Sequence, residues 1–175
     1  QTLGVDANRL IENIQSRIEV CRQKVRGLSV SELPTVVCIE WIDPLMVASN
    51  WIPELVAIAG GQSLFSVSGQ ASAQVRWENL IAADPSIIVV MPCGLDLNRT
   101  QAEMLPLTQR PEWQHLRAVR SGRVYATDGN AYFNRPGPRL VDSLEILAEI
   151  LHPEIFSYGY KGTAWEQVQL PVTSD

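Results

Sequence analysis

Ser86-Ile87-Ile88-Val89-Val90-Met91 predicts a β-strand that is buried on both faces. The run is rich in β-branched residues and shows no alternation of polar and apolar side chains, which is typical of a strand inside a parallel sheet. Pro92-Cys93-Gly94 ends it. Shorter apolar runs at residues 35–39, 64–67 and 123–127 predict three further strands.

Helical patterns separate these strands. They cover residues 77–83, 98–107, 112–119 and 136–151, and another helix begins near Asn50 and stops at Gly60-Gly61. Buried strands that alternate with helices predict an α/β fold, with a doubly wound, mainly parallel sheet flanked by helices. In such sheets ligands bind outside the carboxyl ends of the strands. We therefore expect a site among the loops at residues 40–44, 66–74, 92–97 and 127–135.

One long helix is predicted at the start, over residues 6–27. Leu10, Ile14, Ile18, Cys21 and Val25 share one face of it, and its length is about 33 Å at 1.5 Å per residue. Such a helix is either a strut to an upstream part or a surface helix packed on the sheet, and the pattern favours neither. We divide the chain into this helix at 5–28, an α/β lobe at 34–155 and an extended tail at 156–175.

Composition excludes several classes of protein. The 175 residues carry 14 Lys and Arg against 19 Asp and Glu, which disfavours binding to nucleic acid or to anionic lipid. No apolar run approaches the ~20 residues that span a bilayer. Cys21, Cys38 and Cys93 form no CxxC pair, so we expect three small buried side chains. Because Gln1 comes first and no signal segment follows, we expect a chain that was processed or excised from a longer protein.

Catalytic motifs are missing from the sequence. It contains no GxGxxG or GxxxxGK[ST] loop for phosphates and no GxSxG elbow. His115 and His152 have no partners at metal-ligand spacing. Asp96 and Asp128 fall on the expected ligand-side loops, but two loop acids do not indicate acid–base catalysis. We predict neither an enzyme nor a metal site nor a resident cofactor. The rival hypothesis is a small α/β enzyme that acts on a nucleotide or a cofactor.

Aromatic and amide side chains occupy the expected ligand side. Trp41 follows the first strand, and Asn130-Ala131-Tyr132-Phe133-Asn134-Arg135-Pro136 follows the last one. Large apolar faces with a few amides and one cation suit a bulky, flat organic ligand. Trp51, Trp77 and Trp113 lie on helices, where packing in the core is the better interpretation.

Several segments resemble the cobalamin-type (class III) substrate-binding proteins of ABC importers. They cover roughly residues 5–155, and their order and spacing carry the resemblance more than any single segment. The segments are Cys38-Ile39-Glu40-Trp41-Ile42-Asp43-Pro44, Trp51-Ile52-Pro53-Glu54-Leu55, Ala59-Gly60-Gly61, Ala83-Asp84-Pro85-Ser86-Ile87-Ile88-Val89, Gly122-Arg123-Val124-Tyr125-Ala126 and the run from Asn130 to Arg139.

The resemblance implies half of a two-lobe protein that clamps its ligand between the lobes. This chain would supply the inter-lobe helix and the C-terminal lobe. The implied partners are cobalamin or a related corrinoid and an ABC permease in the membrane, without direct membrane insertion of this segment. Haem or a siderophore as ligand, and a non-transport sensor module, are the alternatives. The implied location is the periplasm or the cell surface, while the free cysteines keep a cytoplasmic alternative open.

Seven residues follow from the resemblance as site residues. Glu54 matches a glutamate that docks on permease arginines, although a first-turn acid that stabilises its helix is the competing interpretation. Some family members place an acid and an arginine where this chain has Asn130 and Arg135. The implied ligand-binding residues are Trp41, Asp43, Asn130, Tyr132, Phe133 and Arg135.

Overall fold

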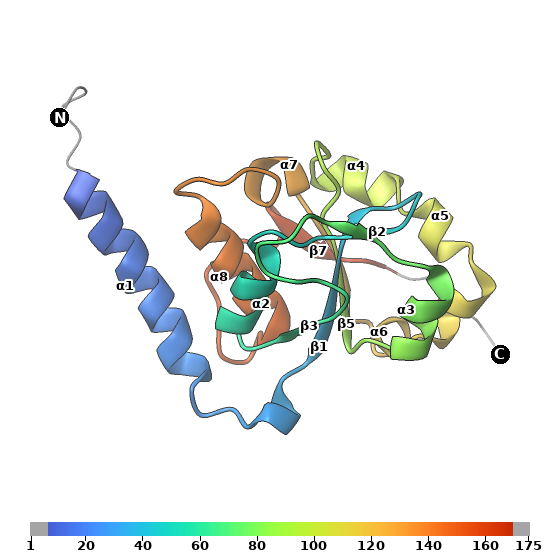
Figure 1. Ribbon diagram of the computed structural model, residues 1–175, viewed down its shortest axis with the longest axis horizontal. Helices are drawn as coiled ribbons and strands as arrows, with labels where there is room; N and C mark the ends of the chain where they lie inside the picture. The colour runs from blue at the N-terminus through green and yellow to red at the C-terminus, as the bar shows by residue number, and fades with distance from the viewer. Residues whose placement is uncertain (1–6, 170–175) are drawn as a thin grey trace.

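Strand β5 (Ile87–Val90) lies at the centre of a sheet between two parallel neighbours. The structure is a computed structural model, and it describes residues 7–169 (Figure 1). Within this range the sheet has seven strands. The other six are β1 (Thr35–Trp41), β2 (Met46–Val47), β3 (Gln62–Ser63), β4 (Ala73–Gln74), β6 (Val124–Thr127) and β7 (Trp165–Gln167).

The sheet has a parallel centre and antiparallel edges. Its order is β4-β2-β1-β5-β6-β7, and β3 pairs with the start of β1. Strands β1, β3, β5 and β6 run parallel, whereas β2, β4 and β7 are antiparallel to their neighbours. The predicted α/β fold is confirmed.

Two apolar cores cover the two faces of the sheet. Successive residues of β1 alternate between them: Val36 and Cys38 pack on one side, and Val37 and Ile39 on the other. All four residues of β5 are fully buried. Because both faces are covered, the central strands are continuously apolar, which explains the pattern that predicted them.

Helices form a layer on each side of the sheet (Figure 1). One layer contains α1 (Ala7–Val25), α2 (Ile52–Ile58) and α8 (Leu140–Leu151). The other contains α3 (Trp77–Ala83), α4 (Leu97–Ala102), α5 (Leu105–Thr108), the 3-10 helix η2 (Pro111–His115) and α6 (Arg117–Arg120). Helix α7 (Gly129–Tyr132) follows β6, and the 3-10 helix η1 (Val30–Glu32) precedes β1.

Helix α1 carries the predicted apolar face, but only Cys21 on it is buried. Ile18 and Val25 pack at the margin of the core, whereas Leu10 is 43% exposed. The main polar attachment is Arg17, which pairs with two acids of α8. The helix therefore lies against the lobe along its second half and is largely exposed along its first.

Three predicted helices differ from the observed ones. The helix expected at 98–107 is divided into α4 and α5, because Pro106 lacks an N–H and would clash with the preceding turn. The helix expected at 112–119 is η2 and α6, separated by Leu116 in an extended conformation. Helix α8 begins at Leu140 instead of Pro136, because Pro136 and Pro138 keep the preceding residues out of helical geometry.

Three other segments also differ from expectation. Instead of a strand at 64–67, the chain pairs with β1 only at Gln62–Ser63 and turns away at Phe65, whose φ is 64°. The expected turn at 128–130 becomes the start of α7. The expected extended tail contributes β7, and Trp165 is 7% exposed because its ring packs edge-on against Tyr125. Residues 5, 6 and 170–175 of the expected helix and tail lie outside the described residues.

Candidate ligand-binding site

The loops after β1, β5 and β6 meet at one edge of the sheet, at the top of Figure 1. Because these strands are parallel and adjacent, their carboxyl ends lie together. Three hollows open between the loops. The loops predicted at 40–44, 92–97 and 127–135 line them. The fourth predicted loop, residues 66–74, lines none of the three, but its Ser72 donates a hydrogen bond to Glu40 at the same edge.

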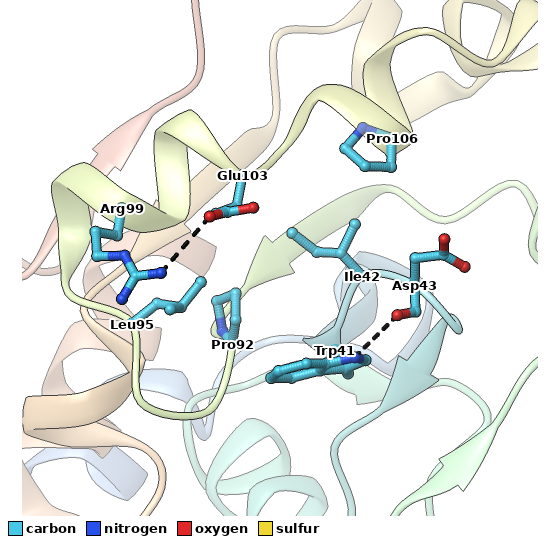
Figure 2. A pocket seen from close by; sticks show the side chains of 8 residues that line it. All are labelled: Trp41, Ile42, Asp43, Pro92, Leu95, Arg99, Glu103 and Pro106. Carbon is cyan, nitrogen blue, oxygen red and sulfur yellow. Dashed lines mark hydrogen bonds and ion pairs between the residues drawn. The ribbon is translucent and has the colours of Figure 1, made fainter.

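The first hollow, the Trp41 pocket, has a volume of about 310 Å³ (Figure 2). The Trp41 side chain is 42% exposed, and its indole Nε1 donates to the backbone oxygen of Asp43 at 3.0 Å. The hydrogen bond fixes the ring while one face stays open to solvent. The lining residues are Trp41, Ile42, Asp43, Pro92, Leu95, Arg99, Glu103 and Pro106.

Helix α4 forms the opposite wall of the Trp41 pocket. Asp96 caps it by accepting a hydrogen bond from the Arg99 backbone N–H at 2.9 Å. Arg99 and Glu103 form an exposed ion pair at 3.6 Å over the hollow (Figure 2). The pocket is therefore mainly apolar, with one weak ion pair at its rim, and it suits stacking of a flat organic group.

The second hollow, the Arg135 pocket, has a volume of about 490 Å³ and lies in the segment that joins α7 to α8. Asp128 caps α7 by accepting from the Ala131 N–H at 2.7 Å. The Ala131 carbonyl in turn accepts from Arg139 Nη1 at 3.3 Å. The lining residues are Asn130, Ala131, Arg135, Pro136, Gly137, Pro138 and Arg139.

The third hollow, the Cys93 pocket, is smaller, at about 110 Å³. Cys93 is exposed, contrary to the expectation of a buried side chain, because the loop after β5 turns outward at Gly94, whose φ is 76°. Partial burial and the nearby Glu40 carboxylate raise the pKa of the Cys93 thiol. The lining residues are Glu40, Ser49, Asn50, Trp51, Ile52, Cys93, Phe133 and Asn134.

The predicted ligand-binding residues are distributed over the three hollows. Trp41 and Asp43 line the first, and Asn130 and Arg135 line the second. Phe133 lines the third but is only 2% exposed, so its ring is mainly part of the core.

Tyr132 lines none of the three hollows. Its ring meets that of Tyr160 edge-on at 6.1 Å, and its carbonyl accepts a hydrogen bond from Ser143. The sequence reasoning missed Arg99, Glu103 and Arg139. For Arg139 the sequence did offer a signal, because only Pro136-Gly137-Pro138 separates it from Arg135. We expected a helix from Pro136 onward, and Arg139 was therefore assigned to that helix instead of to the loop.

Of the remaining candidates, Trp51 lines the Cys93 pocket, and the others lie away from the three hollows. Glu54 is exposed in the first turn of α2, and its role in docking stays a prediction. Trp113 is fully buried, while Trp51 and Trp77 are half-buried against the cores, as expected. His152 is buried, with Nε2 2.9 Å from the Gly60 carbonyl, and His115 is exposed in η2.

Residues 7–169 offer neither a metal centre nor a membrane-spanning helix. They contain no cluster of three or more His, Cys, Asp or Glu side chains that could hold a metal ion. No helix in that range has the length and apolarity needed to cross a membrane.

Comparison with known proteins gives consistent similarities. A haem uptake protein, IsdE of Staphylococcus aureus, is 26% identical over 130 residues, which are 70% of this chain and 44% of that protein. A substrate-binding protein of an ABC transporter from Listeria monocytogenes has a similar structure, with a TM-score of 0.72 at 22% identity over 84% of this chain and 57% of that one. The haem complex of S. aureus IsdE gives 0.70 at 21% identity, over 83% and 57%.

These similarities also define the extent of the match. The chain spans about half the length of the relatives that it matches. The relatives are named as binding or uptake proteins, which agrees with the prediction that this chain is not an enzyme. The pattern of the family described as "Periplasmic binding protein" matches residues 6–131, most of the described chain. The chain therefore belongs to the periplasmic binding protein family.

Proposed function

We propose that this chain is the ligand-binding C-terminal lobe, with the inter-lobe helix, of the substrate-binding component of an ABC importer. Its ligand is a flat tetrapyrrole held at the carboxyl edge of the sheet. The observation that carries this proposal is the half-exposed Trp41 ring, fixed by its hydrogen bond to Asp43 at the open end of the central strands. A rigid aromatic face loses little conformational freedom when a ligand stacks on it.

Among tetrapyrroles we favour haem over cobalamin. The support is that similar proteins carry haem in their names, among them S. aureus IsdE and a periplasmic haem-binding protein of Pseudomonas aeruginosa. Neither His115 nor His152 lines the edge. This lobe would therefore contribute stacking and edge contacts, rather than a histidine ligand, to the bound molecule.

The partner and the location follow from the same proposal. An ABC permease would receive the ligand, with Glu54 as a docking contact on α2, since its carboxylate is exposed and makes no ion pair with any described residue. Charge pairing of this kind favours orientation and rate of encounter more than affinity. The protein would act in the periplasm or at the cell surface.

The test compares two variants in a titration with hemin and with cyanocobalamin, followed by visible absorbance. We expect hemin to bind the chain weakly, because one wall of a cleft leaves much of the ring in water. Trp41→Ala should weaken hemin binding about three- to tenfold. Phe65→Ala is the matched control, since Phe65 is 37% exposed and lines none of the three hollows.

Three outcomes would contradict the proposal in different ways. Binding of neither ligand at high micromolar concentration would reject a tetrapyrrole site. Binding of cyanocobalamin without hemin would restore the corrinoid assignment. An equal loss of hemin affinity in the Trp41 and Phe65 variants would show that the ligand does not bind at the carboxyl edge.

A further inference from the structure

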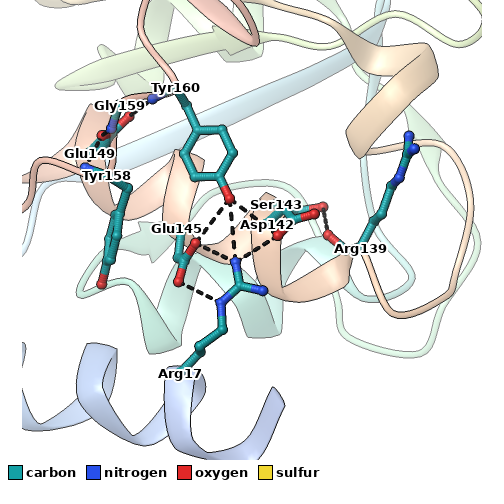
Figure 3. A network of polar contacts seen from close by, with 9 residues as sticks. All are labelled: Arg17, Arg139, Asp142, Ser143, Glu145, Glu149, Tyr158, Gly159 and Tyr160. Atoms are coloured by element: carbon teal, nitrogen blue, oxygen red, sulfur yellow. Dashed lines mark hydrogen bonds and ion pairs between the residues drawn. The ribbon is translucent and has the colours of Figure 1, made fainter. Parts of the chain in front are cut away.

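Helix α1 is attached to the lobe through one arginine that serves two carboxylates. Arg17 Nη2 donates to Asp142 at 2.6 Å, and Arg17 also donates through Nε to Glu145 at 2.8 Å (Figure 3). The hydroxyl of Tyr160 lies in the same group, 3.2 Å from the Asp142 carboxylate and 3.0 Å from that of Glu145. Both acids belong to α8, whereas Tyr160 lies between α8 and β7. These four side chains, the Arg17 cluster, therefore join three separate parts of the chain.

The position of Tyr160 in the cluster depends on Arg17. Burial and the hydrogen bond to Glu145 raise the pKa of the Tyr160 hydroxyl, so it stays protonated and has one hydrogen to donate. That hydrogen satisfies one carboxylate, while Arg17 pairs with both and also donates to the hydroxyl oxygen at 3.3 Å. Without the arginine, one carboxylate would face the phenol oxygen with no hydrogen between them. Because the Glu145 side chain is only 8% exposed, water would not compensate it, and we expect the tyrosine to shift.

The turn that begins at Tyr160 contacts both ends of α7. The Tyr160 ring meets the ring of Tyr132, the last residue of that helix, edge-on at 6.1 Å. The Tyr160 carbonyl accepts a hydrogen bond from the Ala164 N–H at 2.8 Å. The Ala164 carbonyl in turn accepts one from the N–H of Asp128, the N-cap of α7, also at 2.8 Å. A shift of Tyr160 is therefore transmitted to both ends of α7.

Helix α7 is packed against the loop that follows β5. A Cβ on Gly129 would lie 2.3 Å from the Pro92 carbonyl oxygen, and the Asn130 N–H donates to the Leu95 carbonyl at 3.1 Å. Pro92 and Leu95 both line the Trp41 pocket. Because so close a contact leaves no free space, a displaced α7 has to move this wall of the pocket.

We infer that Tyr160 is a positioning residue that couples the attachment of α1 to the shape of the carboxyl edge. The coupling runs from the Arg17 cluster through the turn at 160–164 and α7 to the loop after β5. It does not depend on which ligand binds, but its effect on affinity rests on the proposed function, in which α1 joins this lobe to the other one. Because coupling between two sites is reciprocal, a ligand that fixes the edge also strengthens the attachment of α1.

The first test is hydrogen exchange of the α7 backbone amides, at residues 130–133, followed by NMR without ligand. Arg17→Met should speed their exchange about three- to tenfold, as expected for a residue inside a coupled network. The matched control is Arg123→Met. It removes an arginine that donates to the Leu151 carbonyl at 2.8 Å, at the far end of α8, and it should leave the α7 amides unchanged.

Tyr160→Phe keeps the ring and guards against a folding defect in the arginine variant. Alone, it should speed exchange of the α7 amides about threefold, because the ring is no longer fixed by its hydroxyl. Adding Arg17→Met to it should then change the exchange rate less than about twofold, since the hydroxyl that connects the two residues is already absent.

The second test is a titration with hemin. Arg17→Met should weaken binding about two- to fivefold, although Arg17 lines none of the three hollows, and Arg123→Met should bind as the parent does.

Three results would overturn the inference. They are unchanged α7 exchange in Arg17→Met, an equal effect of this substitution with and without the Tyr160 hydroxyl, and unchanged hemin affinity in Arg17→Met. Failure of every chain, the parent included, to bind hemin would reject the proposed function instead, and the exchange rates alone would then decide whether the coupling exists.

Discussion

Glu149 is the residue whose replacement should destabilise the lobe most clearly. It lies in α8, is 4% exposed, and accepts four hydrogen bonds from the segment that follows the helix; Figure 3 shows it beside Tyr158, Gly159 and Tyr160. One carboxylate oxygen accepts from the backbone N–H groups of Tyr158 and Gly159. The other accepts from the Tyr160 N–H at 3.2 Å and from Trp165 Nε1 at 2.9 Å. This carboxylate thus attaches the approach to β7 to the core.

Glu149→Gln keeps the shape of the side chain but replaces one acceptor oxygen with an NH₂ group. That group would face two N–H donors, so two charge-assisted hydrogen bonds are lost, each worth about 1.5–3 kcal/mol. After some relaxation we expect a loss of about 3 kcal/mol, which lowers Tm by about 6–12 °C for a chain of this size.

The assay is thermal unfolding followed by far-UV circular dichroism. The control is Glu103→Gln, which removes an exposed carboxylate that is 56% accessible and should change stability by less than about 0.5 kcal/mol. A Glu149→Gln transition within 2 °C (about 1 kcal/mol) of the control would refute the reasoning, because it would mean that the four donors find other partners.

Three further predictions concern the attachment of α1, the close packing of Gly129 against the loop after β5, and docking. Arg17→Met removes the ion pairs of Arg17 with Asp142 and Glu145 and should lower the free energy of unfolding in urea by about 1–3 kcal/mol; an unchanged midpoint would contradict the role of these pairs in holding α1 on the lobe. Gly129→Ala places a Cβ 2.3 Å from the Pro92 carbonyl oxygen, so it should lower Tm measurably, and a Tm equal to that of the parent would contradict this close approach. Glu54→Ala should reduce capture by the permease without changing hemin affinity, and equal capture would remove the docking role.

Local sequence patterns were sufficient for the elements that depend on local interactions. The buried strand around residues 87–90 and the helix at Trp77–Ala83 appear where they were expected, since a continuous apolar run and a short amphipathic period each define one conformation. The carboxyl edge was predictable too. It follows from the parallel order of the strands, whichever residues occupy the loops.

Features that depend on distant contacts could not be predicted in the same way. Strand β7 forms because Trp165 packs on Tyr125 and donates to Glu149, contacts that span 40 and 16 residues. Tyr132 and Phe133 are adjacent in sequence, yet one packs against Tyr160 and the other lies in the core. Their contacts depend on the direction in which each side chain leaves the short helix α7. That direction cannot be inferred from the fact that both residues lie in a loop after a strand.

The central claim is that the ligand covers the carboxyl edge of the sheet, and Cys93 allows a direct measurement. Cys21 and Cys38 are buried, so Cys93 is the cysteine that alkylation should reach first. The measurement is the rate of Cys93 alkylation with and without gallium protoporphyrin, which is redox-inactive and spares the thiol from iron-driven oxidation. The control reporter is Arg120→Cys in a Cys93→Ser chain, on α6 away from the edge. We expect the ligand to slow alkylation of Cys93 in proportion to occupancy and to leave the control rate unchanged. An unchanged Cys93 rate with the ligand bound would contradict the account.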